Sequence, residues 1–255
     1  MSMKRILLGA TSPDLLGTLE IILKHWGYRV LVTSRVGEFE ELLNGSNPEF
    51  ILIGDGMLAA AEDLLRQQLR EQIRKTGLPL VVLGRPSGPT IPKPWVGLDV
   101  PIDIFALFEL VQKHLEKHPR RNLRMEVRIP GMVCRDNTSE LAEVLSISTR
   151  GMFIKTSYRL EPQDQFQVVF PLLGMNRELE LPGRVVYRME PRPENNYRQG
   201  VGLEFADLSD ETRRQLEAFL EQRLLGELSE GRRGAELDLG MLRSRSARPS
   251  PGLVP

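Results

Sequence analysis

The sequence is poor in cysteine and contains no long hydrophobic run. Its single cysteine, Cys134, excludes an internal disulfide and a cysteine-based metal cluster. No apolar run approaches the roughly 18 residues that a membrane-spanning helix needs. The apolar run that follows Lys4 and Arg5 ends at Pro13, which is too early for a signal peptide. We therefore expect a cytoplasmic protein without a membrane span.

The chain also lacks a net charge, because 34 Lys and Arg residues are balanced by 34 Asp and Glu residues. General attraction to nucleic acids or anionic lipids is not expected, so any anion site must be local, and we predict no DNA binding. The sequence has no phosphate loop, no nucleophile elbow and no zinc-protease motif. We therefore predict that the protein is not an enzyme and has no catalytic residue, no metal site and no cofactor.

In residues 4–118, short apolar runs alternate with amphipathic segments whose period is near 3.6 residues. This alternation predicts an α/β domain with a parallel sheet. The expected strands are 5–10, 28–33, 50–55 and 78–84, and the expected helices are 13–25, 36–43, 58–75 and 102–117. Prolines and glycines crowd residues 84–103, so one helix of the usual alternation is expected to be missing there.

After Pro119 the pattern changes to short β-rich segments that are broken by Gly, Pro and Asn. This pattern predicts a small all-β antiparallel barrel. The expected strands are 124–129, 132–136, 140–148, 151–156, 166–173, 177–189 and 199–205. A final helix is expected after Ser209, its N-cap, with an apolar stripe formed by Leu216, Phe219, Leu220 and Leu224. The predicted division is 1–118, 119–225 and a flexible tail at 226–255.

The first domain resembles the receiver domain of bacterial response regulators, in the stretches KRILLGATSPDLLGTLEIILKHWGYRVLVTS and PEFILIGDGM. A receiver accepts a phosphoryl group on an aspartate that ends its third strand, and an acidic pair holds the Mg²⁺ ion. The positions that correspond to this apparatus are Ala10, Thr11, Gly54, Gly84 and Val100. The resemblance therefore implies a degenerate, flavodoxin-like receiver domain that docks a protein partner instead of accepting phosphate.

Asp55 lies one residue beyond the position of the phosphoacceptor. Because side chains along a strand alternate between its two faces, a shift of one residue turns the carboxylate away from the expected site. We interpret Asp55 as a polar turn residue that precedes Gly56.

Fixed positive charge gathers where the two predicted domains join. The stretch HPRRNLRMEVRIPG contains Arg120, Arg121, Arg124 and Arg128. The planar guanidinium group forms bidentate hydrogen bonds with phosphate and can stack on a base. Taken alone, however, this pattern is more often that of a solvated, charged linker.

A second pattern follows in LSISTRGMFIKT. Together, RRNLR, SISTRGMFI, GRVVY, GVGLEFADLS and the terminal helix resemble the PilZ domain over residues 119–225. PilZ domains are bacterial β-barrel receptors for cyclic di-GMP with an R-x-x-x-R motif and a D/N-x-S-x-x-G motif. The resemblance implies a site for this nucleotide formed by Arg120, Arg121, Arg124, Ser146, Ser148, Arg150 and Gly151.

Two positions depart from the family pattern. Ser146 replaces an acidic or amide residue that accepts hydrogen bonds from guanine, and the loss of one such bond could weaken binding by about 1–3 kcal/mol. Arg150 replaces a small residue, and it could either contact a phosphate or block the site.

Two functional hypotheses stay open, and a third possibility is that the barrel is unrelated to the PilZ family. In one, the protein is a signalling adaptor in which cyclic di-GMP orders the arginine-rich linker. In the other, it is a PilZ-like scaffold that no longer binds nucleotide and acts only through protein contacts. The sequence identifies neither the protein partner nor the pathway, and it leaves a homodimer open.

Overall fold

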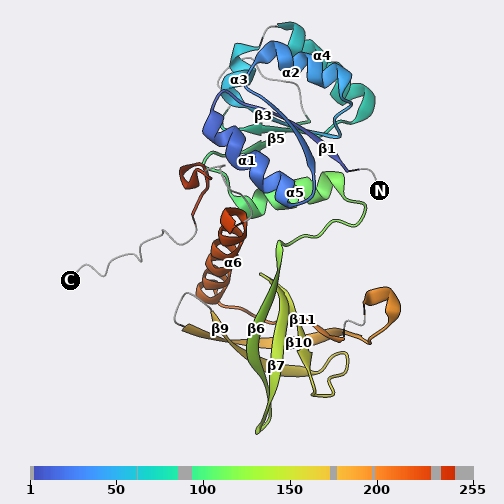
Figure 1. The fold of residues 1–255 in the computed structure, drawn as a ribbon, viewed down its shortest axis with the longest axis vertical. Helices are drawn as coiled ribbons and strands as arrows, with labels where there is room; N and C mark the ends of the chain where they lie inside the picture. Colours follow the sequence, from blue (N-terminus) through green and yellow to red (C-terminus); the bar gives the residue numbers. More distant parts are fainter. Residues whose placement is uncertain are drawn as a thin grey trace, which may run out of the picture. The chain divides into compact units, whose positions relative to one another are not determined.

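The structure is a computed structural model that describes residues 3–61, 63–85, 94–172, 177–196, 199–230 and 237–244 (Figure 1). The chain divides into two compact units. The first unit comprises Met1–Arg121 together with Leu225–Arg243, and the second contains Asn122–Leu224.

The first unit is a parallel sheet flanked by helices. Its strands are β1 (Arg5–Gly9), β2 (Arg29–Thr33), β3 (Phe50–Gly54), β4 (Leu80–Leu83) and β5 (Val96–Leu98), and its helices are α1 (Pro13–His25), α2 (Val36–Gly45), α3 (Asp55–Ala60), α4 (Asp63–Thr76) and α5 (Ile104–Leu115). The strand order β2-β1-β3-β4-β5 is that of doubly wound, flavodoxin-like folds. This confirms the predicted receiver-like architecture.

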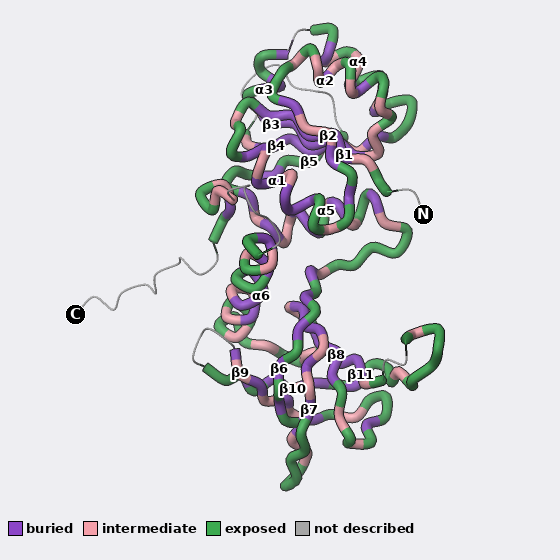
Figure 2. Tube along the Cα trace, in the orientation of Figure 1, coloured by how far each residue is buried: buried purple, intermediate pink, exposed green. Residues whose placement is uncertain are grey.

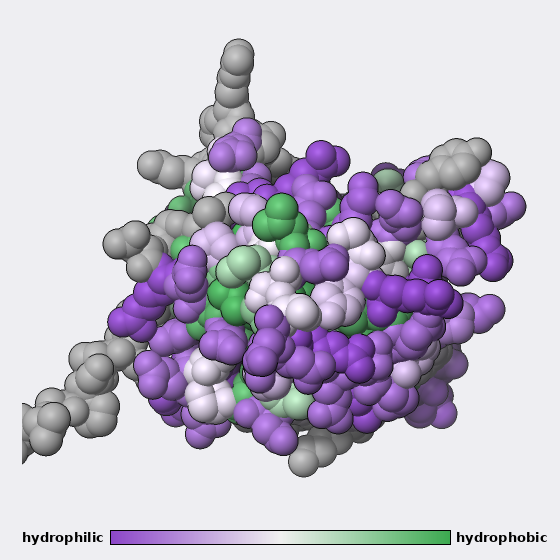
Figure 3. Space-filling model, turned by 90° about the horizontal axis from the view of Figure 1, so that it is seen from below, coloured by the Kyte–Doolittle hydropathy of each residue, from purple (hydrophilic) through white to green (hydrophobic). Residues whose placement is uncertain are grey.

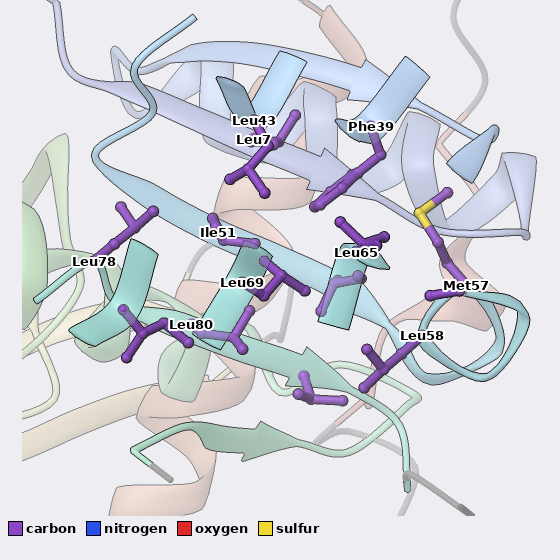
Figure 4. Packing of buried hydrophobic residues seen from close by; sticks show 14 residues of the cluster. Leu7, Phe39, Leu43, Ile51, Met57, Leu58, Leu65, Leu69, Leu78 and Leu80 are labelled. Carbon is purple, nitrogen blue, oxygen red and sulfur yellow. The ribbon is translucent and has the colours of Figure 1, made fainter. Parts of the chain in front are cut away.

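On one face of the sheet, apolar side chains pack against the buried sides of α2, α3 and α4 (Figure 4). Leu7 and Ile51 contribute from the strands, Phe39 from α2, and Leu65 and Leu69 from α4. The central strand β3 is buried along its whole length, which explains its uninterrupted apolar sequence (Figure 2).

The helix expected at 58–75 is instead two helices, because α3 already begins at Asp55 and the backbone is extended at Ala61, before α4. Part of the stretch in which a helix was expected to be missing forms the short strand β5. Residues 86–93 of that stretch lie outside the described residues.

The second unit contains a closed antiparallel barrel, as predicted. Its strands are β6 (Arg124–Arg135), β7 (Thr138–Ser148), β8 (Gly151–Thr156), β9 (Gln165–Leu172), β10 (Arg177–Met189) and β11 (Gly200–Phe205), in the order β10-β11-β8-β7-β6-β9. The sequence predicted two strands where β6 runs continuously through Pro130. Strand β9 pairs with β6 only from Met132 to Cys134, so the proline costs no hydrogen bond to β9.

Along β6 and β9, buried apolar residues alternate with residues that are exposed or half-buried (Figure 2). One register row of the interior crosses five strands and consists of buried residues: Met125, Ile147, Met152, Leu203 and Val185. The residues before and after each of these therefore lie on the outer face. Register irregularities occur beside this row, after Glu126 on β6 and before Ser146 on β7.

Helix α6 (Asp210–Glu230) follows the barrel. Its N-cap is Ser209, as predicted, because the hydroxyl accepts a hydrogen bond from the backbone N–H of Thr212 at 3.1 Å. The predicted apolar stripe is buried, with Leu216, Phe219, Leu220 and Leu224 each at most 3% exposed. The division between the two units falls within this helix.

Part of the tail that was expected to be flexible, residues 226–255, has a defined structure. Helix α6 continues to Glu230, and residues 237–243 belong to the first unit, where η2 (Leu239–Met241) lies. The backbone N–H of Ile102 donates to Met241 O, and the N–H of Arg243 donates to Ile102 O, both at 2.8 Å. Leu242 is only 7% exposed. Residues 231–236 and 245–255 lie outside the described residues.

Hydrophilic side chains dominate the face of the molecule in Figure 3, with smaller apolar areas between them. On the barrel, the cross-strand partners Met132 and Leu141 are 43% and 79% exposed. Among the described residues, no helix combines the length and hydropathy of a membrane span.

Candidate functional site

The barrel brings most of the predicted site residues together on its outer face. Arg124 at the start of β6 is the direct cross-strand partner of Ser148 at the end of β7. Two residues along, Glu126 is the partner of Ser146. Directly opposed residues of antiparallel strands project from the same face, with Cβ atoms about 5 Å apart. The first motif's Arg124 and the second motif's serines therefore share one face.

Ser148 and Gly151 define the turn that joins β7 to β8. The Ser148 hydroxyl donates to Gly151 O at 3.0 Å and accepts from the backbone N–H of Arg150 at 3.4 Å. Both Ser148 and Ser146 are only 4% exposed. The serine of the motif thus holds the turn together, and a ligand would meet a hydroxyl that already has partners.

Gly151 is required by the barrel itself. A Cβ atom at this position would lie 2.1 Å from Leu203 O on β11, whose next residue, Glu204, pairs with Gly151. A glycine in a binding motif can allow a ligand to approach the backbone closely. The atoms that approach it in the structure are those of the β11 backbone.

The arginines differ in their placement. Arg124 and Arg150 are exposed residues of the second unit, whereas Arg120 and Arg121 are exposed residues of the first. Within the described part of the chain, no carboxylate forms an ion pair with any of these four guanidinium groups. Their charge is therefore not neutralised by a described acidic neighbour.

The backbone of Arg120 is attached to the first unit. Its N–H donates to Gln112 Oε1 of α5 at 3.1 Å, and Gln112 Nε2 donates to the Tyr28 hydroxyl, also at 3.1 Å. That hydroxyl donates to Glu116 Oε1 at 2.9 Å. Burial, followed by the bond to Glu116, raises the pKa of Tyr28, so the phenol stays protonated as a donor.

A pair of aromatic rings continues the row that contains Ser146. Ser146 pairs with Phe153, Phe153 with Gly202, and Gly202 with Tyr187. The rings of Phe153 and Tyr187 stack with centroids 6.2 Å apart, and a Cβ on Gly202 would lie 2.2 Å from Tyr187 Cε1. Sequence reasoning missed this pair, although two glycines at alternate positions of the β11 segment mark a surface that is open to large rings.

The first unit has a cleft of about 650 Å³ at the carboxyl ends of its strands. This is the edge where a receiver has its phosphorylation site, and it is lined here by Ala10, Thr11, Gly54, Gly84 and Val100, among others. The segment 237–243 contributes Met241 and Arg243 to the lining. The sequence did not predict that contribution, because the segment shows no sustained hydrophobic period.

Asp55 also lines this cleft, contrary to the expectation that its carboxylate turns away. It is the first residue of α3 rather than a strand residue, so the alternation of strand side chains does not apply. Its carboxylate accepts from the N–H of Gly56 at 2.7 Å and from the N–H of Arg85 at 3.1 Å. Gly84 has a φ of +93°, and a Cβ there would lie 2.5 Å from Asp55 Oδ2. Asp55 thus stabilises the turn after β4.

The comparisons with known proteins yield matches to PilZ proteins and matches to receiver-like proteins. Residues 117–222 match the family model of the PilZ domain. The structure is similar to that of the inhibitor of motility MotI/DgrA from Bacillus subtilis, with 13% identity over 43% of this chain and 53% of that chain and a TM-score of 0.37. It is similar to YcgR in complex with c-di-GMP from Escherichia coli, with 18% identity over 44% of this chain and 50% of that chain and a TM-score of 0.37.

A third similar structure is the chemotaxis protein CheY4 from Vibrio cholerae, with 16% identity over 45% of this chain and 100% of that chain and a TM-score of 0.39. The alignments span about half the length of the MotI/DgrA and YcgR chains. No curated protein sequence matches the chain. The family match and the sheet order confirm the resemblances found in the sequence: residues 117–222 match the PilZ domain model, and they follow a receiver-like α/β domain.

Proposed function

We propose that the protein is a signalling adaptor that binds cyclic di-GMP. In this proposal Arg120, Arg121 and Arg124 clamp the phosphates of the nucleotide, and the receiver-like domain docks a protein partner. The observation that carries the proposal is the cross-strand pair of Arg124 and Ser148, which joins the two motifs of the PilZ family on one face. An exposed guanidinium group on that face suits a nucleotide with two phosphates.

The docking role rests on the chemistry of the first unit. The cleft presents alanine and glycine where a receiver has its metal-binding and phosphate-accepting carboxylates, and the Asp55 carboxylate is engaged by two backbone N–H groups. A surface without phosphotransfer chemistry can still bind a partner. We therefore propose that the protein is not an enzyme and that a phosphodonor leaves Asp55 unlabelled.

A second function is favoured by a specific observation. Ser148 and Gly151 already have structural roles in the β7–β8 turn and in the packing of β11. The same residues would persist in a PilZ-like scaffold that no longer binds nucleotide and acts only through protein contacts. Nucleotide binding by the full chain separates these two functions.

Isothermal titration calorimetry of the full chain with cyclic di-GMP tests the proposal. Loss of charged hydrogen bonds worth about 1.5–3 kcal/mol is expected to weaken binding by roughly 10- to 150-fold in Arg124→Ala. The matched control is Arg177→Ala, which removes an exposed arginine at the start of β10 and should bind like the wild type. Ser146→Asp restores the acidic residue of the family motif and should retain binding. Absence of heat for both the wild type and Ser146→Asp would contradict the proposal and favour the scaffold.

A further inference from the structure

The departure at Ser146 leaves the guanine edge of the proposed ligand without the acceptor that the family motif provides. A guanine presents an N–H and an NH₂ group side by side on its pairing edge, and a carboxylate accepts from both. A serine hydroxyl offers less acceptor capacity, and Ser146 is only 4% exposed. If this face binds guanine, another residue has to supply the acceptor.

Glu126 is placed to do so. It is the direct cross-strand partner of Ser146, so the two Cβ atoms are expected about 5 Å apart on the same face. Glu126 is exposed, in contrast to Ser146. Its side chain is one methylene longer than that of aspartate, so it can bring a carboxylate next to the space that an aspartate at position 146 would occupy.

The neighbours of Glu126 complete a pattern that suits a guanine nucleotide. Burial alternates strictly along the first half of β6, which places Arg124, Glu126 and Arg128 on the outer face, with neighbours about 7 Å apart. Two cations therefore flank one anion. Guanidinium groups suit phosphate oxygens, and a carboxylate suits the donor edge of the base.

We infer that Glu126 is the residue that reads the guanine edge of the ligand, in place of the acidic or amide residue that Ser146 replaces. This inference rests on the proposed function and adds the residue that determines base specificity. Adenine has no paired donors at the corresponding positions, so a carboxylate at 126 also selects against cyclic di-AMP.

The test combines a variant with an altered ligand. In calorimetry with the full chain, Glu126→Ala is expected to bind cyclic di-GMP about 10- to 100-fold more weakly, whereas Glu180→Ala, which removes an exposed carboxylate from β10, should bind like the wild type. Cyclic di-IMP lacks the NH₂ group of guanine. The wild type should bind it more weakly than cyclic di-GMP, and Glu126→Ala should show little of this difference.

A restoring variant separates recognition from folding. Ser146→Asp in the Glu126→Ala background should recover binding, because the carboxylate returns one strand away, and a purely structural defect would not be repaired in this way. Two outcomes would refute the role of Glu126 and leave the proposed function standing, provided that the wild type binds cyclic di-GMP. In one, Glu126→Ala binds cyclic di-GMP as well as the wild type does. In the other, Glu126→Ala discriminates against cyclic di-IMP as strongly as the wild type does. If the wild type does not bind cyclic di-GMP at all, the proposed function itself fails.

Discussion

A substitution at Gly151 tests whether this motif residue serves the packing of the barrel or the binding of a ligand. An alanine Cβ would lie 2.1 Å from Leu203 O and 3.1 Å from Leu203 C, both of which are backbone atoms in the middle of β11. A normal contact with the oxygen needs about 1 Å more, so the β8–β11 pairing must open at this point. Overpacking costs about 1–3 kcal/mol, and each lost ladder hydrogen bond costs about 0.5–1.5 kcal/mol. We expect Gly151→Ala to destabilise the barrel by about 3 kcal/mol.

A matched control is available at Gly183 on β10. A Cβ there would meet the side chain of the same residue, Leu203, at 3.4 Å, which is an ordinary contact with a flexible group. Gly183→Ala should therefore change the free energy of unfolding by less than about 1 kcal/mol. The two variants differ in whether the new methyl group meets backbone or side-chain atoms.

Thermal unfolding can follow the two units separately. Both tryptophans, Trp26 and Trp95, belong to the first unit, as does Tyr28, whereas Tyr158 and Tyr187 belong to the second. For a barrel of this size, 3 kcal/mol corresponds to a decrease in Tm of roughly 12–24 °C. This decrease should appear in the near-UV circular dichroism of the barrel tyrosines, measured in a Tyr28→Phe background, with little change in tryptophan fluorescence. Equal Tm values for Gly151→Ala and Gly183→Ala would refute the packing role of Gly151. The glycine would then be explained by close approach of a ligand.

Two further outcomes concern the first unit. Leu242→Ala should lower its free energy of unfolding by about 2 kcal/mol, because Leu242 is 7% exposed, whereas Leu239→Ala at a 58% exposed position should have little effect. Urea unfolding monitored by tryptophan fluorescence measures both, and equal effects would show that segment 237–243 does not pack as described. Burial lowers the pKa of His114 from 6.5, so the unfolded chain binds the proton more readily. The free energy of unfolding should therefore fall as the pH decreases from 6.5 towards the lowered pKa of His114. His114→Gln should remove part of this pH dependence. An unchanged pH dependence in His114→Gln would show that His114 does not cause it.

The sequence predicted both folds because their patterns are local and regular. The apolar run of β3 and the alternating residues of β6 follow directly from burial on two faces and on one face, respectively. The position of Asp55 was predicted wrongly, since the pattern did not reveal that a helix starts at that residue and brings its carboxylate back into the cleft.

The site was only partly predictable for a different reason. Motif spacing predicted Arg124, Ser146 and Ser148 as site residues, but it could not show that Glu126 faces Ser146, because cross-strand register depends on the irregularity that follows Glu126 in β6. The stacking of Phe153 on Tyr187 depends likewise on the pairing of β8, β11 and β10. Contacts of this kind are set by tertiary structure rather than by spacing along the chain.

The return of segment 237–243 to the first unit makes the barrel an insertion in topological terms. The chain leaves the receiver-like unit at Arg121 and re-enters it at Leu225. A protein truncated after residue 118 would lack the partners of the Ile102 backbone groups and the side chain of Leu242. Autonomous expression of the first unit should therefore need the C-terminal segment supplied in trans or joined by a short connection, even though nearly half the sequence separates the two.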